Sequence, residues 1–235
     1  MIFSMAHYKD IASLLEKLAY SFNDIELLTE ALTHRSYATK NNERLEFLGD
    51  GILNFVIAHE LFKQYPDVQE GDLSRLRATL VNKESLAEIA GQLNLGEVIL
   101  LGTGELKSGG FRRPSILADT VESILGAVYI DGGFESCRDL IVRLYAKRLA
   151  SPTDLQSLKD PKTRLQELLQ SRRFSLPEYR VVNITGQAHA QIFHVRCSID
   201  KMNITGAGEG KCRRKDEQDA AEKAISKVVT YYGDS

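Results

Sequence analysis

The sequence has no long hydrophobic run. Nowhere in its 235 residues does a stretch approach the ~20 consecutive apolar residues that a bilayer-spanning helix needs. The first four residues, MIFS, also lack the basic segment and long apolar core of a secretory signal peptide. We therefore expect a protein with no membrane partner, and a cytoplasmic location follows by default.

Cysteine is scarce as well. The three cysteines, Cys137, Cys197 and Cys212, lie far apart in the sequence. They lack the paired spacing that is typical of zinc sites, and their number does not indicate a disulfide framework. We expect all three to be reduced and structural.

The chain has little net charge, -2 at pH 7, but this total hides two parts of opposite sign. Residues 160–230 hold 13 Lys or Arg against 9 Asp or Glu, whereas the rest of the chain holds 17 against 23. Hydrophobic residues make up 43% and charged residues 26%, which fits a globular protein and excludes a disordered or fibrous one. The charge pattern predicts an acidic body that carries a basic domain.

The first 149 residues are predicted to be all-α. Apolar residues recur there at spacings of three and four, as an amphipathic helix requires. Examples are Ile11, Leu14 and Leu18, then Leu45, Leu48 and Ile52, then Leu86, Ile89 and Leu93. Residues 102–110 are rich in glycine and predict a loop. Residues 150–159 begin ASPTD, which is the composition of a linker.

A second domain is predicted over residues 160–230, with the order α-β-β-β-α. Asp160 can cap a helix in which Pro161 is the first residue. Residues 193–199 alternate apolar and polar side chains as a half-buried strand does. Residues 179–184 and 201–205 are further strand candidates, with Gly186 and Gly206 as turns. A final helix is expected from Arg213.

Two rows of acidic residues stand out in the first domain. Glu43, Glu46 and Asp50 fall within a ~60° arc of one helix face, opposite the stripe of Leu45, Leu48 and Ile52. Asp119 and Glu122 are three residues apart within an apolar run. Each row alone could be a solvated surface, which such rows usually are. Buried carboxylates, however, are costly unless a cation offsets them, and neither row has a matched basic residue at i+4.

A bound divalent metal would remove that cost. Oxygen-only ligands favour a hard ion such as Mg²⁺, for which Mn²⁺ can substitute. Such an ion can activate water and stabilise the oxygens of a phosphodiester displacement. Phosphodiester chemistry is therefore the natural use of these carboxylates.

Residues 43–50, ERLEFLGD, closely resemble the signature of ribonuclease III, and residues 117–122, LADTVE, resemble its second acidic motif. Residues 31–37 and 70–74 also look like segments of that family. The resemblance spans nearly the whole chain. It implies a magnesium-dependent endonuclease that cuts double-stranded RNA, leaves staggered ends with 5′-phosphates and 3′-hydroxyls, and processes ribosomal and other structured RNA precursors.

The resemblance also implies roles for individual residues. The metal site would be made of Glu46, Asp50, Asp119 and Glu122, with Asp50 and Glu122 closest to the chemistry. Glu43 and Glu70 match auxiliary acidic positions. The family is homodimeric, which implies that Phe47 packs across the two-fold axis, although an ordinary core role would be favoured from the sequence alone. Gly51 stands where Ser is commoner in the family, and we expect a small local effect.

The second domain resembles the double-stranded-RNA-binding domain in its α-β-β-β-α order and its final helix. That fold recognises A-form shape across two minor grooves and the phosphates between them. The resemblance places Gln166, Glu167 and His189 at the minor grooves. Phosphates would be held by four cations at the start of the last helix, where the helix dipole also favours anions: Lys211, Arg213, Arg214 and Lys215. Asp216 and Asp219 depart from the smaller residues often found there, which could weaken binding slightly.

The sequence also admits three other interpretations. The main rival is a double-stranded-RNA-binding protein that has lost cleavage, but all four carboxylates are present. A DNA nuclease is disfavoured because the second domain suits A-form RNA. His34, Arg35 and Ser36 combine a base, a cation and a hydroxyl, yet no cooperating nucleophile surrounds them. A hydrogen-bonded packing role is therefore the better interpretation for these three residues.

Overall fold

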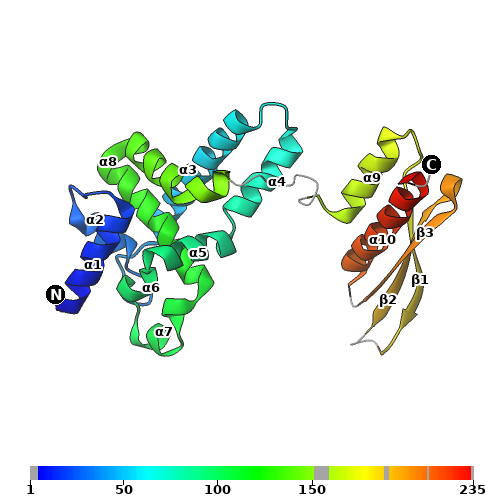
Figure 1. Ribbon diagram of the computed structural model, residues 1–235. Coiled ribbons are helices and arrows are strands. Elements are labelled where there is room, and N and C mark those ends of the chain that lie inside the picture. Colours follow the sequence, from blue (N-terminus) through cyan, green and yellow to red (C-terminus); the bar gives the residue numbers. More distant parts are fainter. Residues whose placement is uncertain (1–4, 151–158, 188–190, 211, 234–235) are drawn as a thin grey trace. The chain divides into compact units, whose positions relative to one another are not determined.

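The chain forms two compact units, residues 1–153 and residues 154–235 (Figure 1). The computed structural model describes residues 5–150, 159–187, 191–210 and 212–233. Each unit is considered by itself. In the described part of the chain, no helix combines the length and apolar character that crossing a bilayer demands.

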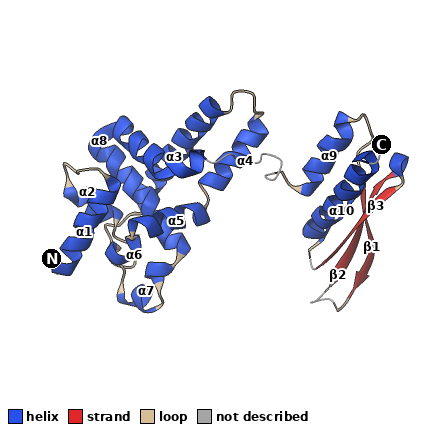
Figure 2. Cartoon of the chain, in the orientation of Figure 1, coloured by secondary structure: helices blue, strands red, loops and turns tan. Residues whose placement is uncertain are grey.

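The first unit is helical, as predicted (Figure 2). The β-type pairing among its described residues is one isolated bridge between Thr33 and Leu100. Its elements run as follows: α1 Met5–Leu18, α2 Ile25–Ala31, α3 Glu43–Gln64, α4 Glu70–Leu80, α5 Lys83–Leu93, α6 Leu95–Val98, α7 Thr103–Lys107, the 3-10 turn η1 Gly110–Arg112, and α8 Pro114–Ala150.

Helix α8 is the central element of this unit and packs against α3, α5 and α2. Its first half is buried on nearly every side, since Val121, Ile124 and Leu125 are each at most 1% exposed. The hydroxyl of Ser123 donates to the backbone oxygen of Ala31 at 2.7 Å, which satisfies a buried polar group. The helix is interrupted at Gly133, whose φ of 77° is a conformation that glycine adopts readily.

Helices α3 and α8 approach unusually closely because glycines face backbone at their crossing. A Cβ atom on Gly49 would overlap the backbone oxygen of Glu122, and one on Gly126 would overlap that of Leu45. Any side chain at these two positions would therefore push the helices apart. The acidic residues of the two helices are brought together at this crossing.

The predicted apolar stripe of α3 was partly wrong. Leu45 is buried, but Leu48 and Ile52 are only half-buried, and the core face continues through Gly49 and Leu53 instead. The spacing of apolar residues could not show which face of α3 is buried, because this helix carries apolar residues on more than one side. Its additional apolar face carries Phe47 and Phe55, which are 83% and 59% exposed.

The predicted loop at residues 102–110 was also partly wrong, because α7 lies within it. Four glycines in nine residues gave a loop signal, yet Gly104 lies inside the short helix. Only Gly109, with a φ of 80°, adopts the left-handed conformation for which glycine is suited. The segment connects α6 to the start of α8.

The second unit has the predicted α-β-β-β-α order: α9 Pro161–Ser171, β1 Glu178–Thr185, β2 Ile192–Ile199, the 3-10 turn η2 Asp200–Met202, β3 Ile204–Gly210 and α10 Arg213–Gly233. The three strands form an antiparallel sheet in the order β1-β2-β3. Helix α10 packs on the sheet and on α9. The core between them includes Leu165, Leu169, Val195, Cys197 and Ala220.

The start of α9 is confirmed, since the Asp160 side chain accepts from the backbone amide of Thr163 at 3.1 Å and Pro161 is the first helical residue. The third strand, in contrast, begins three residues later than expected and runs to Gly210. Gly206 is therefore not a turn. It lies within β3 against the backbone of Ala220, so its lack of a side chain lets α10 pack closely on the sheet.

Candidate metal centre and nucleic-acid interface

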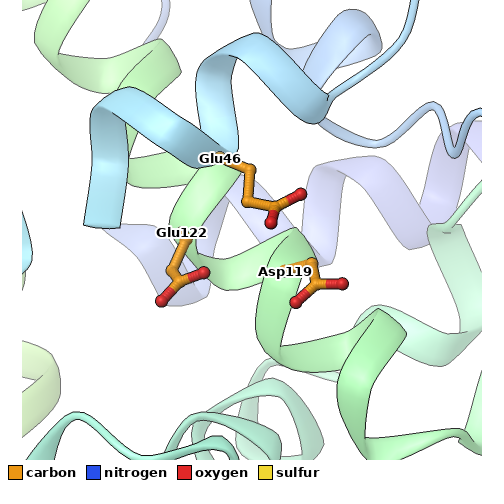
Figure 3. Close-up of side chains that lie close together, drawn as sticks. All are labelled: Glu46, Asp119 and Glu122. Carbon is orange, nitrogen blue, oxygen red and sulfur yellow. The ribbon is translucent and has the colours of Figure 1, made fainter. Parts of the chain in front are cut away.

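Three carboxylates from two helices gather at the crossing of α3 and α8. Glu46 lies on α3, and Asp119 and Glu122 lie one turn apart on α8. One oxygen of each lies within 4.8 Å of an oxygen of the others, and all three residues are half-buried (Figure 3). A single cation could contact all three, which is the donor set that a hard divalent ion prefers.

The pKa values of the three carboxyl groups indicate an excess of negative charge in the cluster. Burial, together with the negative charges of Asp50, Asp119 and Glu46, raises the pKa of Glu122 to about 8. Burial and the charge of Asp119 raise the pKa of Glu46, and burial raises that of Asp119. Such shifts arise where ionised carboxylates are crowded and partly desolvated, and a divalent cation would relieve them.

Lys83, at the start of α5, is a counter-charge to the cluster that the sequence did not reveal. Its charge lowers the pKa values of Glu46, Asp119 and Glu122. It forms no recorded ion pair with these carboxylates among the described residues. No sequence signal could have found it, because it lies 37 residues after Glu46 and belongs to neither acidic motif.

Asp50 lies one turn after Glu46 on α3 but is not part of the group of three. Its Oδ1 accepts from Nδ2 of Asn54 at 2.8 Å, and its side chain is exposed. Its charge nevertheless raises the pKa values of Glu122 and Glu46, so Asp50 interacts electrostatically with the cluster. Its assignment to the metal site stays a prediction.

The two auxiliary acidic residues occupy different places. Glu43 lies in the first turn of α3, where its Oε1 is 3.3 Å from Nη1 of Arg35. Glu70 begins α4 and accepts from the hydroxyl of Ser74 at 2.7 Å. Glu43 lines a cavity beside the cluster together with Glu46 and Asp119. Glu70 is not among the residues that line it.

His34 and Ser36 form a loop contact at the wall of the same cavity. The backbone amide of Ser36 donates to Nδ1 of His34, and the amide of Gly102 donates to the Ser36 hydroxyl at 3.0 Å. Because a backbone amide can only donate, Nδ1 of His34 must be an acceptor, which leaves Nε2 as the ring donor. These bonds agree with the packing role favoured from the sequence.

The described candidates for RNA binding in the second unit lie on two helices. Gln166 and Glu167 are exposed on α9, and Glu167 accepts from Nζ of Lys159 at 2.7 Å. Three exposed cations, Arg213, Arg214 and Lys215, form the first turn of α10. Nε of Arg213 lies 3.0 Å from Glu217. His189 and Lys211 lie outside the described residues.

Comparison with known proteins identifies the family. A family model described as "Ribonuclease-III-like" matches residues 24–149, and one described as "Double-stranded RNA binding motif" matches residues 161–228. The chain belongs to the ribonuclease III family. The two matched segments fall in the helical unit and in the α-β-β-β-α unit, respectively.

Other ribonucleases of the family are similar over nearly their whole length. The protein named "Ribonuclease 3" of Nitrosococcus oceani is 56% identical over 218 residues, which cover 92% of this chain and 94% of that protein. The "Ribonuclease 3" of Buchnera aphidicola subsp. Schizaphis graminum is 54% identical over 213 residues, covering 90% and 93%. Both domains of the family are therefore represented in one chain.

Solved ribonuclease III structures agree with the helical unit. A crystal structure of the nuclease domain of ribonuclease III from Campylobacter jejuni is 46% identical, with a TM-score of 0.59, and covers 62% of this chain and 99% of that one. A second structure of that domain, 48% identical with a TM-score of 0.57, covers 58% and 96%. Its description concerns structural flexibility in a region involved in dimer formation.

Proposed function

We propose that the carboxylate cluster of α3 and α8 is the metal-dependent catalytic centre of this double-stranded-RNA endonuclease. The observation that carries the proposal is the meeting of Glu46, Asp119 and Glu122, whose oxygens lie within 4.8 Å of one another. Two acidic motifs that are about 70 residues apart in the sequence thus supply one cation site. A solvated acidic surface would not need this convergence.

The residues fit a hard divalent ion, and we assign Mg²⁺ as the natural one, with Mn²⁺ as a substitute. The donor set is entirely carboxylate oxygen, and burial with mutual repulsion raises the pKa of Glu122 to about 8. When bound, such an ion lowers the pKa of water and stabilises charge on phosphodiester oxygens. The protein supplies the anionic site and its fixed geometry.

Asp50 and Glu122 are proposed to act closest to the cleaved phosphodiester. Glu122 is held rigidly because its backbone faces Gly49 at the helix crossing. Asp50 lies on the more exposed side of the cluster, where its carboxylate is oriented by Asn54. Glu43 and Glu70 would act indirectly, by ordering Arg35 and the start of α4.

The second unit is proposed to hold the duplex without identifying its sequence. Gln166 and Glu167 would face the minor grooves, and the cations of the first turn of α10 would contact phosphates, because a helix N-terminus favours anions. His189 and Lys211 keep the roles that the family resemblance implies. Phosphate contacts position a duplex without reading its bases, so binding should depend more on salt than on sequence.

We further propose a homodimer in which Phe47 packs across a two-fold axis. Phe47 is 83% exposed on α3, and a partner that covers it would remove this apolar surface from water. Phe55, also on α3, contacts Phe134 of α8 with ring centroids 5.8 Å apart, and the two rings line a cavity of about 300 Å³. Two identical centres suit cleavage of the two strands of a duplex.

The family role in processing ribosomal and other structured RNA precursors follows from membership. We propose that the products carry 5′-phosphates and 3′-hydroxyls at staggered ends, because each centre would hydrolyse one strand. The cytoplasmic location stays a prediction.

The substitution Glu122→Gln tests the proposed centre. The full-length variant should bind a long RNA duplex as the unmodified protein does, while its cleavage rate with Mg²⁺ falls by about 1,000-fold or more. Glu88→Gln is the matched control, since Glu88 is an exposed acid that pairs with Arg148 outside the cluster. Electrophoretic mobility measures binding, and product gels measure cleavage.

Each outcome of this experiment separates the candidate functions. Normal turnover by the Glu122→Gln protein would overturn the assignment of the cluster as the catalytic centre. Binding without cleavage by the unmodified protein would favour the rival, a binding protein that has lost catalysis. Preferential cleavage of duplex DNA in the same assay would favour the DNA-nuclease alternative.

A further inference from the structure

Glu217 is an acid that lies among the cations at the start of α10. It follows Arg213 by one helical turn, and its side chain is only 14% exposed. A negative charge at this place repels the phosphates that the neighbouring cations are proposed to hold. The contacts of Glu217 indicate a role that outweighs this repulsion.

Both carboxylate oxygens of Glu217 accept hydrogen bonds from cations, one on each helix of the second unit. Oε2 accepts from Nζ of Lys162 on α9 at 2.7 Å, and Oε1 accepts from Nε of Arg213 on α10 at 3.0 Å. The bond from Lys162, followed by that from Arg213, lowers the pKa of Glu217 below its ordinary value. The carboxylate is therefore ionised at neutral pH and joins the two cations.

Lys162 is itself anchored at the start of α9. Its backbone amide donates to Oε1 of Gln218 at 2.9 Å, and its Nζ lies 4.5 Å from the centre of the Tyr179 ring, which is a cation–π contact. Helices α9 and α10 also pack against each other (Figure 1). The anchored lysine thus fixes one oxygen of Glu217 and leaves the other for Arg213.

The bond to Glu217 leaves the outer end of Arg213 available. A guanidinium can bind a phosphate through two parallel hydrogen bonds from its terminal nitrogens. Glu217 accepts from Nε, which is not one of these nitrogens, and the Arg213 side chain is 63% exposed. An arginine that is already held in place loses less conformational freedom when it binds a phosphate than one that moves freely in water.

We propose that Glu217 is a positioning residue for RNA binding, which holds Arg213 by Nε so that its terminal nitrogens meet a phosphate of the duplex. This inference rests on the proposed phosphate-binding role of the first turn of α10. Glu217 thus strengthens the binding of a polyanion although it is an acid. Asp219 has no such role, because it pairs at 2.7 Å with Lys223, which is not a proposed RNA contact.

The affinity of the full-length protein for one short RNA duplex tests the proposal, measured with a chelator so that no metal supports cleavage. Repulsion alone predicts that Glu217→Gln binds more tightly. Positioning predicts that Kd rises by about two- to ten-fold, the cost of ordering one long side chain, because an amide offers one acceptor oxygen in place of two. Asp219→Asn is the matched control, since it removes the same charge from the same helix. Its Kd should be unchanged or lower.

Combining the substitution with Arg213→Ala supplies the decisive comparison. Arg213→Ala alone should raise Kd by about ten-fold, the worth of a charge-assisted bond. In that variant Glu217 has no guanidinium to hold, so adding Glu217→Gln should leave Kd unchanged or lower it. In steady-state cleavage with Mg²⁺, Glu217→Gln should raise KM while kcat stays within about three-fold, because the carboxylate cluster is unaltered.

The proposal is overturned if Glu217→Gln binds RNA as tightly as the unmodified protein or more tightly. It is also overturned if Glu217→Gln raises Kd by a similar factor with and without Arg213, since loss of packing between α9 and α10 would do so. Normal binding by Arg213→Ala would overturn the proposed role of the α10 first turn together with this inference. Impaired Arg213→Ala beside normal Glu217→Gln would overturn the inference alone.

Discussion

Gly49 of α3 lies directly against the backbone oxygen of Glu122 on α8, and there is no space for even one methyl group between them. One turn before Gly49, Glu46 points into the cluster that Glu122 completes (Figure 3). The close approach of two backbones therefore sets the separation of the proposed metal ligands. Fold and site depend on the same contact.

Gly49→Ala should consequently impair both stability and activity. The added methyl group would force α3 and α8 apart, which we expect to cost about 1–3 kcal/mol or more and to separate Glu46 from Asp119 and Glu122. Thermal unfolding and cleavage rate measure the two effects. The matched control is Gly51→Ala on the same helix, since nothing lies within 4 Å of a Cβ there. It should be neutral or stabilising by about 0.5–1 kcal/mol. Equal behaviour of the two variants would contradict the account.

The stability of the metal-free protein should fall as pH rises through the range in which Glu122 titrates. Its pKa is raised from 4.5 to about 8, so the folded state binds more protons than the unfolded state between these values, and unfolding becomes easier with increasing pH. Glu122→Gln carries no such charge. Melting temperatures measured with a chelator should therefore favour the variant by an amount that grows from pH 4.5 and levels off above about 8. A constant difference across this range would contradict the assigned burial of the charge.

The sequence predicted the helical and α-β-β-β-α units and the two acidic motifs, because these features depend on local periodicity and residue type. It could not predict which face of α3 is buried, since Leu48 and Ile52 recur at the same helical spacing as the buried Leu45 and Leu53. Nor could it find Lys83 or the Lys162–Glu217 pair. Both depend on how distant helices pack, and Gly206 was mistaken for a turn for the same reason.

The first turn of α10 should account for much of the salt dependence of RNA binding. Arg214→Gln removes one exposed cation there, and we expect weaker binding to every duplex sequence. The slope of log affinity against log salt should decrease by about 1. Arg180→Gln is the control, because Arg180 lies on β1 beside Glu178. The slope should be unchanged in that variant. A loss of affinity confined to particular sequences would contradict the phosphate-binding role of Arg214.

Exposure of Phe47 leads to a prediction about oligomeric state. Phe47→Asp places a charge in the middle of the proposed two-fold interface, where desolvating it is costly. Sedimentation should show a shift from dimer to monomer at concentrations at which the unmodified protein is dimeric. Val229→Asp, at a position 55% exposed in the second unit, should leave the dimer intact. A dimeric Phe47→Asp protein would place the interface elsewhere.

Binding of Mn²⁺, followed by electron paramagnetic resonance of the free ion, tests the cation site most directly. The unmodified protein should bind Mn²⁺, and Glu46→Gln, Asp119→Asn and Glu122→Gln should each weaken that binding by about ten-fold or more. Glu88→Gln, which alters an exposed acid outside the cluster, should bind as the unmodified protein does. If all three cluster variants bind Mn²⁺ with unchanged affinity, the three carboxylates do not share a metal ion.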